Sequence, residues 1–311
     1  MIEAERLPRR PTFTSDSLST ESTPRRSLSS FKNFFDAGLP EVVPEVQVRR
    51  GLKWSGRNVC SGTRLTVIFD LDDTLIRNPF GKGVLPHIQR IMSQEGSKTN
   101  CAREFRQETV RLRREGRLVE SFDWDLVVRN IARANRVRIG IDVAELVRMY
   151  SRAPFASLEP GANELLKSLQ EEGHKIVILT NGYEKYQLPL IESLGLVNYD
   201  LLVSPDKIGY IKPQPEAFRL AAKPFLAEGS REPVVVGDSI LFDVWGASLA
   251  GFRAIWLRKD QEARTESVRL PDLGGLVRRT ARREGLESLV KIMPDLTVCT
   301  GADLREVDRL V

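Results

Sequence analysis

Short apolar runs rich in β-branched residues alternate with amphipathic stretches along most of this chain. The apolar runs predict six buried strands, at residues 65–69, 175–180, 199–203, 233–236, 252–257 and, with a weaker pattern, 296–300. Helical patterns separate most of these runs, near residues 160–172, 182–194, 214–227, 241–250 and 302–311. Apolar strands that alternate with amphipathic helices predict an α/β fold, in which helices cover both faces of a parallel sheet.

The interval between the first two predicted strands has a different pattern. Residues 87–150 are nearly all helical in pattern and contain no good strand. They predict a helical domain inserted directly after the first strand, into a core formed by residues 51–86 and 151–311. Two segments that contain proline, residues 78–86 and 151–159, are the expected hinges.

Residues 1–50 are unlike the rest of the chain. Thirteen of the twenty residues from Pro11 to Ser30 are Ser, Thr or Pro, and such a segment buries little apolar surface. We expect this N-terminal tail to be disordered, and no candidate site residue lies in it.

Composition excludes several classes of protein. The 311 residues include no apolar run of eighteen, which excludes a membrane-spanning helix, and no apolar N-terminal stretch typical of a signal peptide. Three widely spaced cysteines make neither a disulfide framework nor a zinc site, and they indicate a reducing cytoplasm. Because the chain has only two histidines, a multi-histidine metal centre is also excluded.

The formal net charge of +5 is concentrated in the helical insert. Residues 88–152 hold 14 Lys and Arg against 9 Asp and Glu, a difference of +5, so the rest of the chain is balanced. The simplest interpretation is a solvated helical surface, and the second is an electropositive cover over an anionic substrate. Nucleic-acid binding ranks below both, because aromatic interleaving and familiar DNA-binding motifs are absent from the sequence.

Chemically active side chains follow four of the predicted strands. They are Asp70 and Asp72 after the first strand, Thr180, Asn181 and Gly182 at the end of the second, Lys212 in a loop after the third, and Asp238 and Asp243 after the fourth. Ligands of parallel α/β sheets bind at the carboxyl ends of the strands, so we expect these side chains to converge. One acidic strand end would be weak evidence for a site, whereas four in order are strong evidence.

The motifs at these strand ends resemble those of the haloacid dehalogenase superfamily. They are Asp-x-Asp-x-Thr from Asp70, a strand that ends in Thr-Asn-Gly, a Lys-Pro loop at Lys212, and Gly-Asp-x-x-x-x-Asp ending at Asp243. The resemblance covers roughly residues 65–257 and does not include the N-terminal tail. It implies a Rossmann-like parallel sheet, and the insert is similar to the α-helical cap of the superfamily's phosphatase and dehalogenase branch.

The carboxylates predict metal-assisted phosphoryl chemistry. A dense group of carboxylates without histidine partners favours a hard cation, which we expect to be Mg²⁺ held by Asp70 and Asp238. Asp70 could attack phosphorus to form an aspartyl-phosphate, because the cation offsets the repulsion between two anions. Asp72 could protonate the leaving alcohol and then deprotonate the attacking water. By the family resemblance, the backbone carbonyl of Asp72 is a third metal ligand.

The remaining motif residues are expected to bind the phosphoryl group and to support the metal. Thr180 and Lys212 would bind phosphoryl oxygens, and Lys212 would counter the charge of the transferring group. Asn181 and Gly182 would offer backbone N–H groups near a helix start. We expect Asp243 to hold the metal's waters or Lys212 rather than the metal itself.

These residues favour an enzyme, a Mg²⁺-dependent phosphatase that hydrolyses a small phosphorylated metabolite. The main alternative is a non-catalytic binding or regulatory protein that kept the same fold. A dehalogenase is disfavoured, because that branch of the family typically lacks the second aspartate of the first motif, here Asp72. A phosphonate-cleaving enzyme would use a lysine of the cap, and Lys98 is the only lysine in the insert.

Three further features receive structural interpretations, and His87 a functional one. His174 stands in a polar turn before a strand, and we expect it to be exposed and inert. Trp124 is interpreted as a core residue of the insert, and the arginines of residues 103–117 as an outer helical face. His87 lies just past the first motif, near the entrance to the insert, and is a weaker candidate for contact with substrate.

Overall fold

The computed structural model describes residues 64–226, 231–258, 266–291, 293–294, 297–301, 303–308 and 310–311. The predictions for the N-terminal tail and for the first residues of the core, 51–63, lie outside the described residues. Within the described part of the chain, no helix is both long and apolar enough to cross a membrane.

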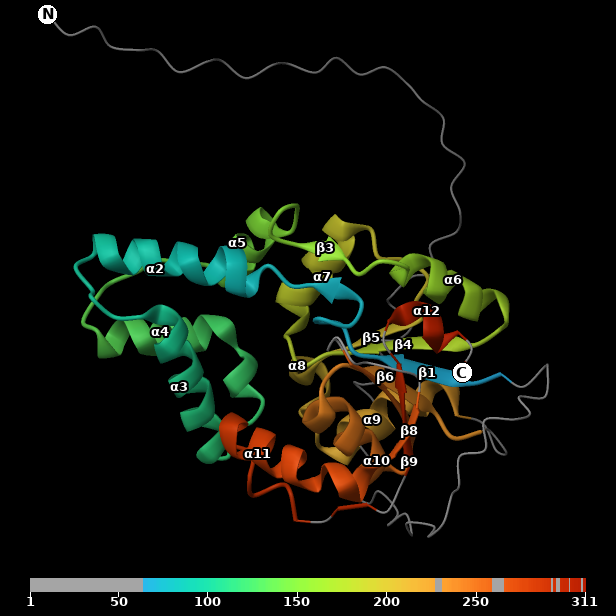
Figure 1. The fold of residues 1–311 in the computed structure, drawn as a ribbon. Helices are drawn as coiled ribbons and strands as arrows, with labels where there is room; N and C mark the ends of the chain where they lie inside the picture. The colour runs from blue at the N-terminus through green and yellow to red at the C-terminus, as the bar shows by residue number, and fades with distance from the viewer. Residues whose placement is uncertain are drawn as a thin grey trace, which may run out of the picture. The chain divides into compact units, whose positions relative to one another are not determined.

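A seven-stranded sheet, in the order β5-β4-β1-β6-β7-β9-β8, forms the centre of the fold (Figure 1). Its strands are β1 (Thr66–Phe69), β4 (Lys175–Leu179), β5 (Leu201–Val203), β6 (Val234–Gly237), β7 (Arg253–Leu257), β8 (Glu266–Arg269) and β9 (Thr297–Gly301). Every pairing is parallel except that of β8 with β9. All six predicted strands are present, and the predicted α/β class is confirmed.

Strand β8 is an element that the hydrophobic pattern did not predict. It reads Glu-Ser-Val-Arg and lies at the edge of the sheet with mostly exposed side chains. An edge strand needs no continuous apolar run, because only one side of its backbone is paired and its faces can remain in water.

Helices lie on both faces of the sheet. Helices α6 (Ala162–Glu171) and α12 (Leu304–Val307) pack together on one face, and α9 (Pro215–Ala222) and α10 (Gly246–Ala250) pack together on the other (Figure 1). The remaining helices of the core are α7 (Glu184–Leu194), α8 (Pro205–Ile208) and α11 (Gly274–Glu284). Helix α11 was not predicted, because its sequence is rich in arginine and buries only a narrow apolar stripe.

Most of the interval between β1 and β4 is a helical insertion, as predicted. It contains α2 (Leu85–Gln94), α3 (Cys101–Arg114), α4 (Trp124–Ala134) and α5 (Val143–Tyr150). Three of these helices begin at a side chain that accepts a hydrogen bond from the first turn: Asn100, Asp123 and Asp142. A two-stranded antiparallel ladder, β2 (Ile76–Arg77) with β3 (Ser157–Leu158), joins the two connections to the core.

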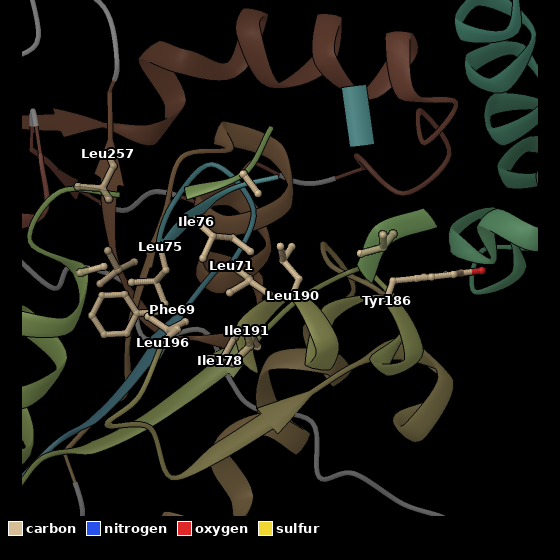
Figure 2. Packing of buried hydrophobic residues seen from close by; sticks show 14 of the residues in the cluster. Phe69, Leu71, Leu75, Ile76, Ile178, Tyr186, Leu190, Ile191, Leu196 and Leu257 are labelled. Atoms are coloured by element: carbon tan, nitrogen blue, oxygen red, sulfur yellow. The ribbon is translucent and has the colours of Figure 1, made fainter. Parts of the chain in front are cut away.

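The centre of the sheet has a continuous apolar interior. All four residues of β1 are buried, and in register Phe69 lies beside Ile178 of β4 and Val236 of β6. Leu71 and Leu75 extend this cluster beneath the turn that follows β1 (Figure 2). The turn that carries the first acidic motif is therefore anchored in the core.

His174 is buried rather than exposed, so that expectation was wrong. Parallel pairing places Lys175 beside Thr66, which brings the preceding His174 next to Leu65. His174 is 7% exposed, and its Nδ1 accepts the backbone N–H of Leu65 at 3.1 Å. The histidine therefore satisfies the first backbone donor of the central strand.

Candidate active site

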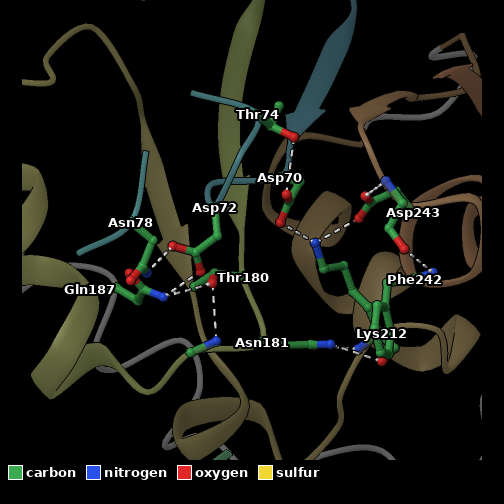
Figure 3. Close-up of polar contacts among 12 residues, drawn as sticks. Asp70, Asp72, Thr74, Asn78, Thr180, Asn181, Gln187, Lys212, Phe242 and Asp243 are labelled. Atoms are coloured by element: carbon green, nitrogen blue, oxygen red, sulfur yellow. Dashed lines mark hydrogen bonds and ion pairs between the residues drawn. The ribbon is translucent and has the colours of Figure 1, made fainter. Parts of the chain in front are cut away.

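The turn after β1 presents two carboxylates. The backbone N–H groups of Leu75 and Ile76 both donate to the carbonyl of Leu71, which closes a tight loop. Asp73 lies at the tip of this loop with φ of 61°, a left-handed conformation that aspartate tolerates better than most residues. Asp70 and Asp72 precede the tip, and their carboxylates have different neighbours (Figure 3).

Asp70 belongs to a buried charged group with Lys212 and Asp243. The Lys212 ammonium contacts the Asp70 carboxylate and lies 2.7 Å from Oδ1 of Asp243. The hydroxyl of Thr74 donates to the second oxygen of Asp70 at 3.0 Å. Lys212 is only 3% exposed. Burial disfavours its charge, but the charges of Asp243 and Asp70 outweigh this effect and raise the pKa of Lys212.

Asp243 is fixed by the segment that follows β6. It lies in the π-helical turn Ile240–Trp245, and its Oδ2 accepts the backbone N–H of Ser239 at 2.9 Å. Burial raises the pKa of Asp243 to about 6, although Lys212 opposes the shift. A Cβ on Gly237 would lie 2.4 Å from the Asp243 carboxyl carbon, so only glycine fits at the end of this strand.

The side chain of Asn181 holds the Lys212 loop in place. Its Oδ1 accepts the backbone N–H of Lys212 at 2.7 Å, and its Nδ2 donates to the carbonyl of Lys212 at 3.0 Å. Sequence reasoning assigned only backbone groups of Asn181 and Gly182 to the site. The structure shows that the N–H of Gly182 donates to the hydroxyl oxygen of Thr180 at 3.0 Å.

Asp72 belongs to a second group, which is made of neutral side chains. The Nδ2 of Asn78 donates to one oxygen of Asp72, and the Nε2 of Gln187 donates to the other at 2.7 Å. The same Nε2 lies 3.4 Å from the hydroxyl oxygen of Thr180. Burial, followed by the charge of Asp70, raises the pKa of Asp72 to about 7, against the lowering effect of the two amides.

Asn78 and Gln187 are site residues that sequence reasoning missed. Gln187 did carry a signal, because it occupies an apolar position of the α7 pattern between Tyr186 and Leu190 and is fully buried. A buried glutamine usually has a specific polar partner. Asn78 carried no comparable signal, since it lies in a connecting segment where asparagine is common.

Three carboxylates could hold a cation. Oxygens of Asp70, Asp238 and Asp243 all lie within 4.8 Å of one another. This donor set fits Mg²⁺, which prefers a few carboxylate oxygens and makes no use of the histidine or cysteine that zinc sites favour. The Lys212 ammonium contacts both Asp70 and Asp243, so this contact does not choose between them, and Asp70 with Asp238 stays the predicted ligand pair. The carboxylate of Asp72 is outside this set, and its backbone carbonyl stays a predicted ligand.

Two further residues interpreted from the sequence, His87 and Trp124, lie in the helical insertion. Nδ1 of His87 is 2.9 Å from the hydroxyl of Tyr150, which gives this histidine a partner within the insertion. Trp124 is 9% exposed, in agreement with its interpretation as a core residue.

Arg113 corrects the interpretation of residues 103–117 as an outer face only. It is 8% exposed, and its guanidinium pairs with Glu284 at 2.7 Å and lies over the ring of Phe122. Glu284 closes helix α11, the helix that the sequence pattern did not predict. A tertiary contact between α3 and α11 therefore buries one arginine of an otherwise polar face.

Sheet order, the helical insertion and the carboxylate-rich strand ends define an α/β core of Rossmann-like type with a helical segment inserted after β1. A family model described as haloacid dehalogenase-like hydrolase matches residues 65–251. The chain belongs to this family, which confirms the resemblance seen in the motifs.

Named relatives include several phosphatases. The chain is 37% identical over 114 residues to ribulose-1,5-bisphosphate 5-phosphatase of Halopiger xanaduensis, covering 36% of this chain and 47% of that protein. It is 29% identical over 210 residues to glyceraldehyde 3-phosphate phosphatase of Methanopyrus kandleri, covering 64% and 88% respectively. The chain spans about half the length of the first curated relatives it matches.

Solved structures share the fold. A haloacid dehalogenase-type phosphatase from Thermococcus onnurineus superposes with a TM-score of 0.56 at 23% identity, covering 79% of this chain and 97% of that one. L-2-haloacid dehalogenases are also among the solved neighbours. The fold is therefore common to enzymes of both chemistries, and the side chains of the site must distinguish them.

Proposed function

We propose that this protein is a Mg²⁺-dependent phosphatase that hydrolyses a small phosphorylated metabolite through an aspartyl-phosphate on Asp70. The observation that carries the proposal is the separation of two nearby carboxylates into different environments. Asp70 contacts an ammonium, whereas the carboxylate of Asp72 accepts from the amides of Asn78 and Gln187 and has a pKa raised to about 7. A charged nucleophile and a proton-transferring group are the two carboxylates that this reaction needs.

Asp70 is suited to attack phosphorus. The ammonium of Lys212 holds one of its oxygens, and the hydroxyl of Thr74 holds the other. Lys212 lies where it would also counter the charge of a transferring phosphoryl group. Mg²⁺ on Asp70 and Asp238 would supply further charge neutralisation between the carboxylate and the phosphate.

Asp72 is suited to move a proton in both halves of the reaction. A pKa near 7 allows it to donate a proton to the leaving alcohol and later to accept one from water. Thr180 would help to bind the phosphoryl group. Its oxygen accepts from Gly182 and Gln187, so its hydroxyl hydrogen could donate to a phosphoryl oxygen. Because the N–H of Gly182 is used in that contact, we assign backbone donation to Asn181 first.

The helical insertion would close over the substrate as a cap, with the predicted bounds 87–150. The segment that leads into it pairs with the segment that leaves it, through Ile76 with Leu158. Closure of such a cap excludes bulk water and selects the leaving group. The relatives named above act on small phosphorylated compounds according to their names, which supports the same substrate class here. Cys101 and Cys299 are free and buried, which fits the proposed cytoplasmic location.

The alternative functions fit less well. A dehalogenase attacks carbon and does not need Asp72 or the amides that hold it. Lys98 is exposed in the loop between α2 and α3, separated from the hinge by a helix about 15 Å long. It is therefore poorly placed for the Schiff base of a phosphonate-cleaving enzyme. A non-catalytic protein would not need the buried Asp70–Lys212 contact.

The test is hydrolysis of a generic aryl phosphate with Mg²⁺, followed by a panel of sugar phosphates, nucleotides and phosphoglycolate. We expect turnover that stops with a chelator and returns when Mg²⁺ is restored. Asp142→Asn is a matched control, because Asp142 is an exposed helix cap and asparagine caps equally well. The absence of hydrolysis across the panel would contradict the proposed function.

A further inference from the structure

The carboxylate of Asp72 is held by two side chains from different segments. Asn78 lies in the connection that leads into the helical insertion, and Gln187 lies in the first turns of α7. Each amide donates to a different oxygen of Asp72 (Figure 3). The plane of the carboxylate is therefore fixed from both sides.

A glutamine is unexpected at position 187 if only the stability of the folded state is considered. It is fully buried, and its Oε1 has no hydrogen-bond partner among the described residues. A buried acceptor without a partner destabilises the folded state, and an apolar side chain of similar size would avoid this. The part of Gln187 that is used is the Nε2 group, which contacts Asp72 and Thr180.

The aromatic neighbours of both amides contact the same residue of the insertion. Phe80 donates its backbone N–H to Oδ1 of Asn78 at 2.7 Å, and Tyr186 directly precedes Gln187. The ring of Trp124, at the start of α4, lies 4.2 Å from the Phe80 ring and 4.6 Å from the Tyr186 ring, measured between centroids.

Polar contacts reinforce the link between α7 and α4. The Tyr186 hydroxyl accepts the backbone N–H of Asp125 at 2.9 Å and lies 2.9 Å from the carboxylates of Asp123 and Asp125. Nζ of Lys185 lies 2.7 Å from Asp125 and 3.2 Å from Asp123. In Figure 2, Tyr186 lies at the edge of the core cluster with its hydroxyl end turned away from Leu190. Three consecutive residues of α7 therefore join the insertion to Asp72.

We infer that Gln187 is a positioning residue for Asp72, and that the contact of Trp124 with Phe80 and Tyr186 makes this positioning depend on the docking of the cap. The inference rests on the proposed function, because it assigns to Asp72 the transfer of a proton. The amides hold the carboxylate towards the phosphoryl site when the cap is docked. Release of Trp124 frees both amides, so proton transfer is available only over a covered substrate.

The first test is a double-mutant cycle of Gln187→Met with Asp72→Asn, using aryl phosphates of graded leaving-group pKa. Gln187→Met should lower kcat about tenfold or more for poor leaving groups, as part of the ~10²–10⁴-fold that general acid–base catalysis contributes. The deficit should shrink for good leaving groups, and KM should change little. In the Asp72→Asn background the same substitution should have no further effect.

Gln170→Met is the matched control, because Gln170 lies on α6 and its amide contacts Asp200 and not Asp72. It should behave as the wild type, and thermal unfolding should show that both variants are folded. An equal loss for all leaving groups, or effects that multiply with Asp72→Asn, would show a structural role and overturn the inference. If the wild type hydrolyses the phosphates but Gln187→Met matches it, only this inference fails. If the wild type hydrolyses none, the proposed function fails first.

The second test addresses the cap. Trp124→Phe keeps an aromatic ring but shortens its reach to Phe80 and Tyr186, and Tyr186→Phe removes only the hydroxyl that contacts α4. Both should show the leaving-group signature of Gln187→Met, and neither should add to it in the double variants. A change in KM alone, with an unchanged dependence on the leaving group, would overturn the link between the cap and Asp72.

Discussion

The two halves of the site hold their carboxylates by different means. Asp70 lies in a group of three charged side chains, which come from the end of β1, from the helical turn that follows β6 and from the loop that contains Lys212. Asp72, two residues further on, contacts two neutral amides, one from the predicted hinge and one from α7. The comparison shows how one turn can place two carboxylates in different surroundings: Asp70 has a cation beside it, whereas burial and the charge of Asp70 raise the pKa of Asp72.

The largest effect on activity should follow from replacing Asp70, the proposed nucleophile of the charged group. Asp70→Asn keeps the shape of the side chain but removes the attacking oxyanion and a candidate metal ligand, so activity should fall to background. Rapid acid quench of the wild type, with mass measurement of the Asp70 peptide, should show the phosphorylated species. A label on another residue, or substantial turnover by Asp70→Asn, would exclude the mechanism.

Replacing Asp72, the carboxylate held by two amides, should lower activity less and should affect some substrates more than others. Asp72→Asn can still form hydrogen bonds but cannot transfer a proton, which typically costs ~10²–10⁴-fold in rate. The loss should shrink for aryl phosphates, which need little protonation to depart, and phosphoenzyme should accumulate because water attack stays impaired. Steady-state rates and acid-quench measurements check both effects, and a uniform loss would contradict the assigned role.

The charged half should also matter more for folding. Lys212→Met leaves two buried carboxylates without their cation, and removal of one partner of a buried ion pair costs roughly 3–5 kcal/mol. Burial raises the pKa of Asp243 to about 6, and loss of Lys212 removes the charge that opposes this shift.

The folded variant therefore binds protons more readily than the unfolded chain, so its deficit should be small in acid and grow as the pH rises past 6. Chemical denaturation at several pH values, with chelator present, measures this deficit. Gln187→Met is the variant to compare with Lys212→Met, because it replaces a neutral amide and so removes no charge from the site. Equal losses of stability in the two variants would show that the two halves do not differ in this way.

Limited proteolysis tests where the predicted hinges of the cap lie. Cleavage is expected first in residues 78–86 and 151–159, the predicted hinges of the cap, and a bound phosphate analogue should slow it by stabilising the closed form. Mapping the fragments by mass spectrometry checks this expectation. First cuts within residues 87–150 would contradict the predicted bounds of the cap.

The smallest effect should come from the N-terminal tail. A shortened chain that begins at Gly51 should fold and turn over substrate normally, because no residue of either half of the site precedes it. Thermal unfolding and steady-state kinetics, compared with the full chain, test this. Loss of folding would show that the tail contributes to the core.

The sequence predicted those strands and motifs that a run of neighbouring residues is enough to indicate. Six strands were predicted because strands buried on both faces need continuous apolar runs, and the site motifs because each follows such a run directly. Strand β8 and helix α11 were not predicted, since an exposed edge strand and an arginine-rich helix carry little apolar pattern. His174 was misjudged because its burial comes from the pairing of two strands more than 100 residues apart.

What the sequence determined by itself is the chemistry of the strand ends: four motifs, in order, with the carboxylates and the lysine that a phosphatase needs. The tertiary structure alone decided how those carboxylates differ. Asp72 and Gln187 are 115 residues apart, and Asp70 and Lys212 are 142 apart. Their contacts, and the burial that shifts the pKa of Asp72, exist only after the sheet and the insertion have brought distant segments together, because charge and desolvation act through space and leave no pattern in the chain.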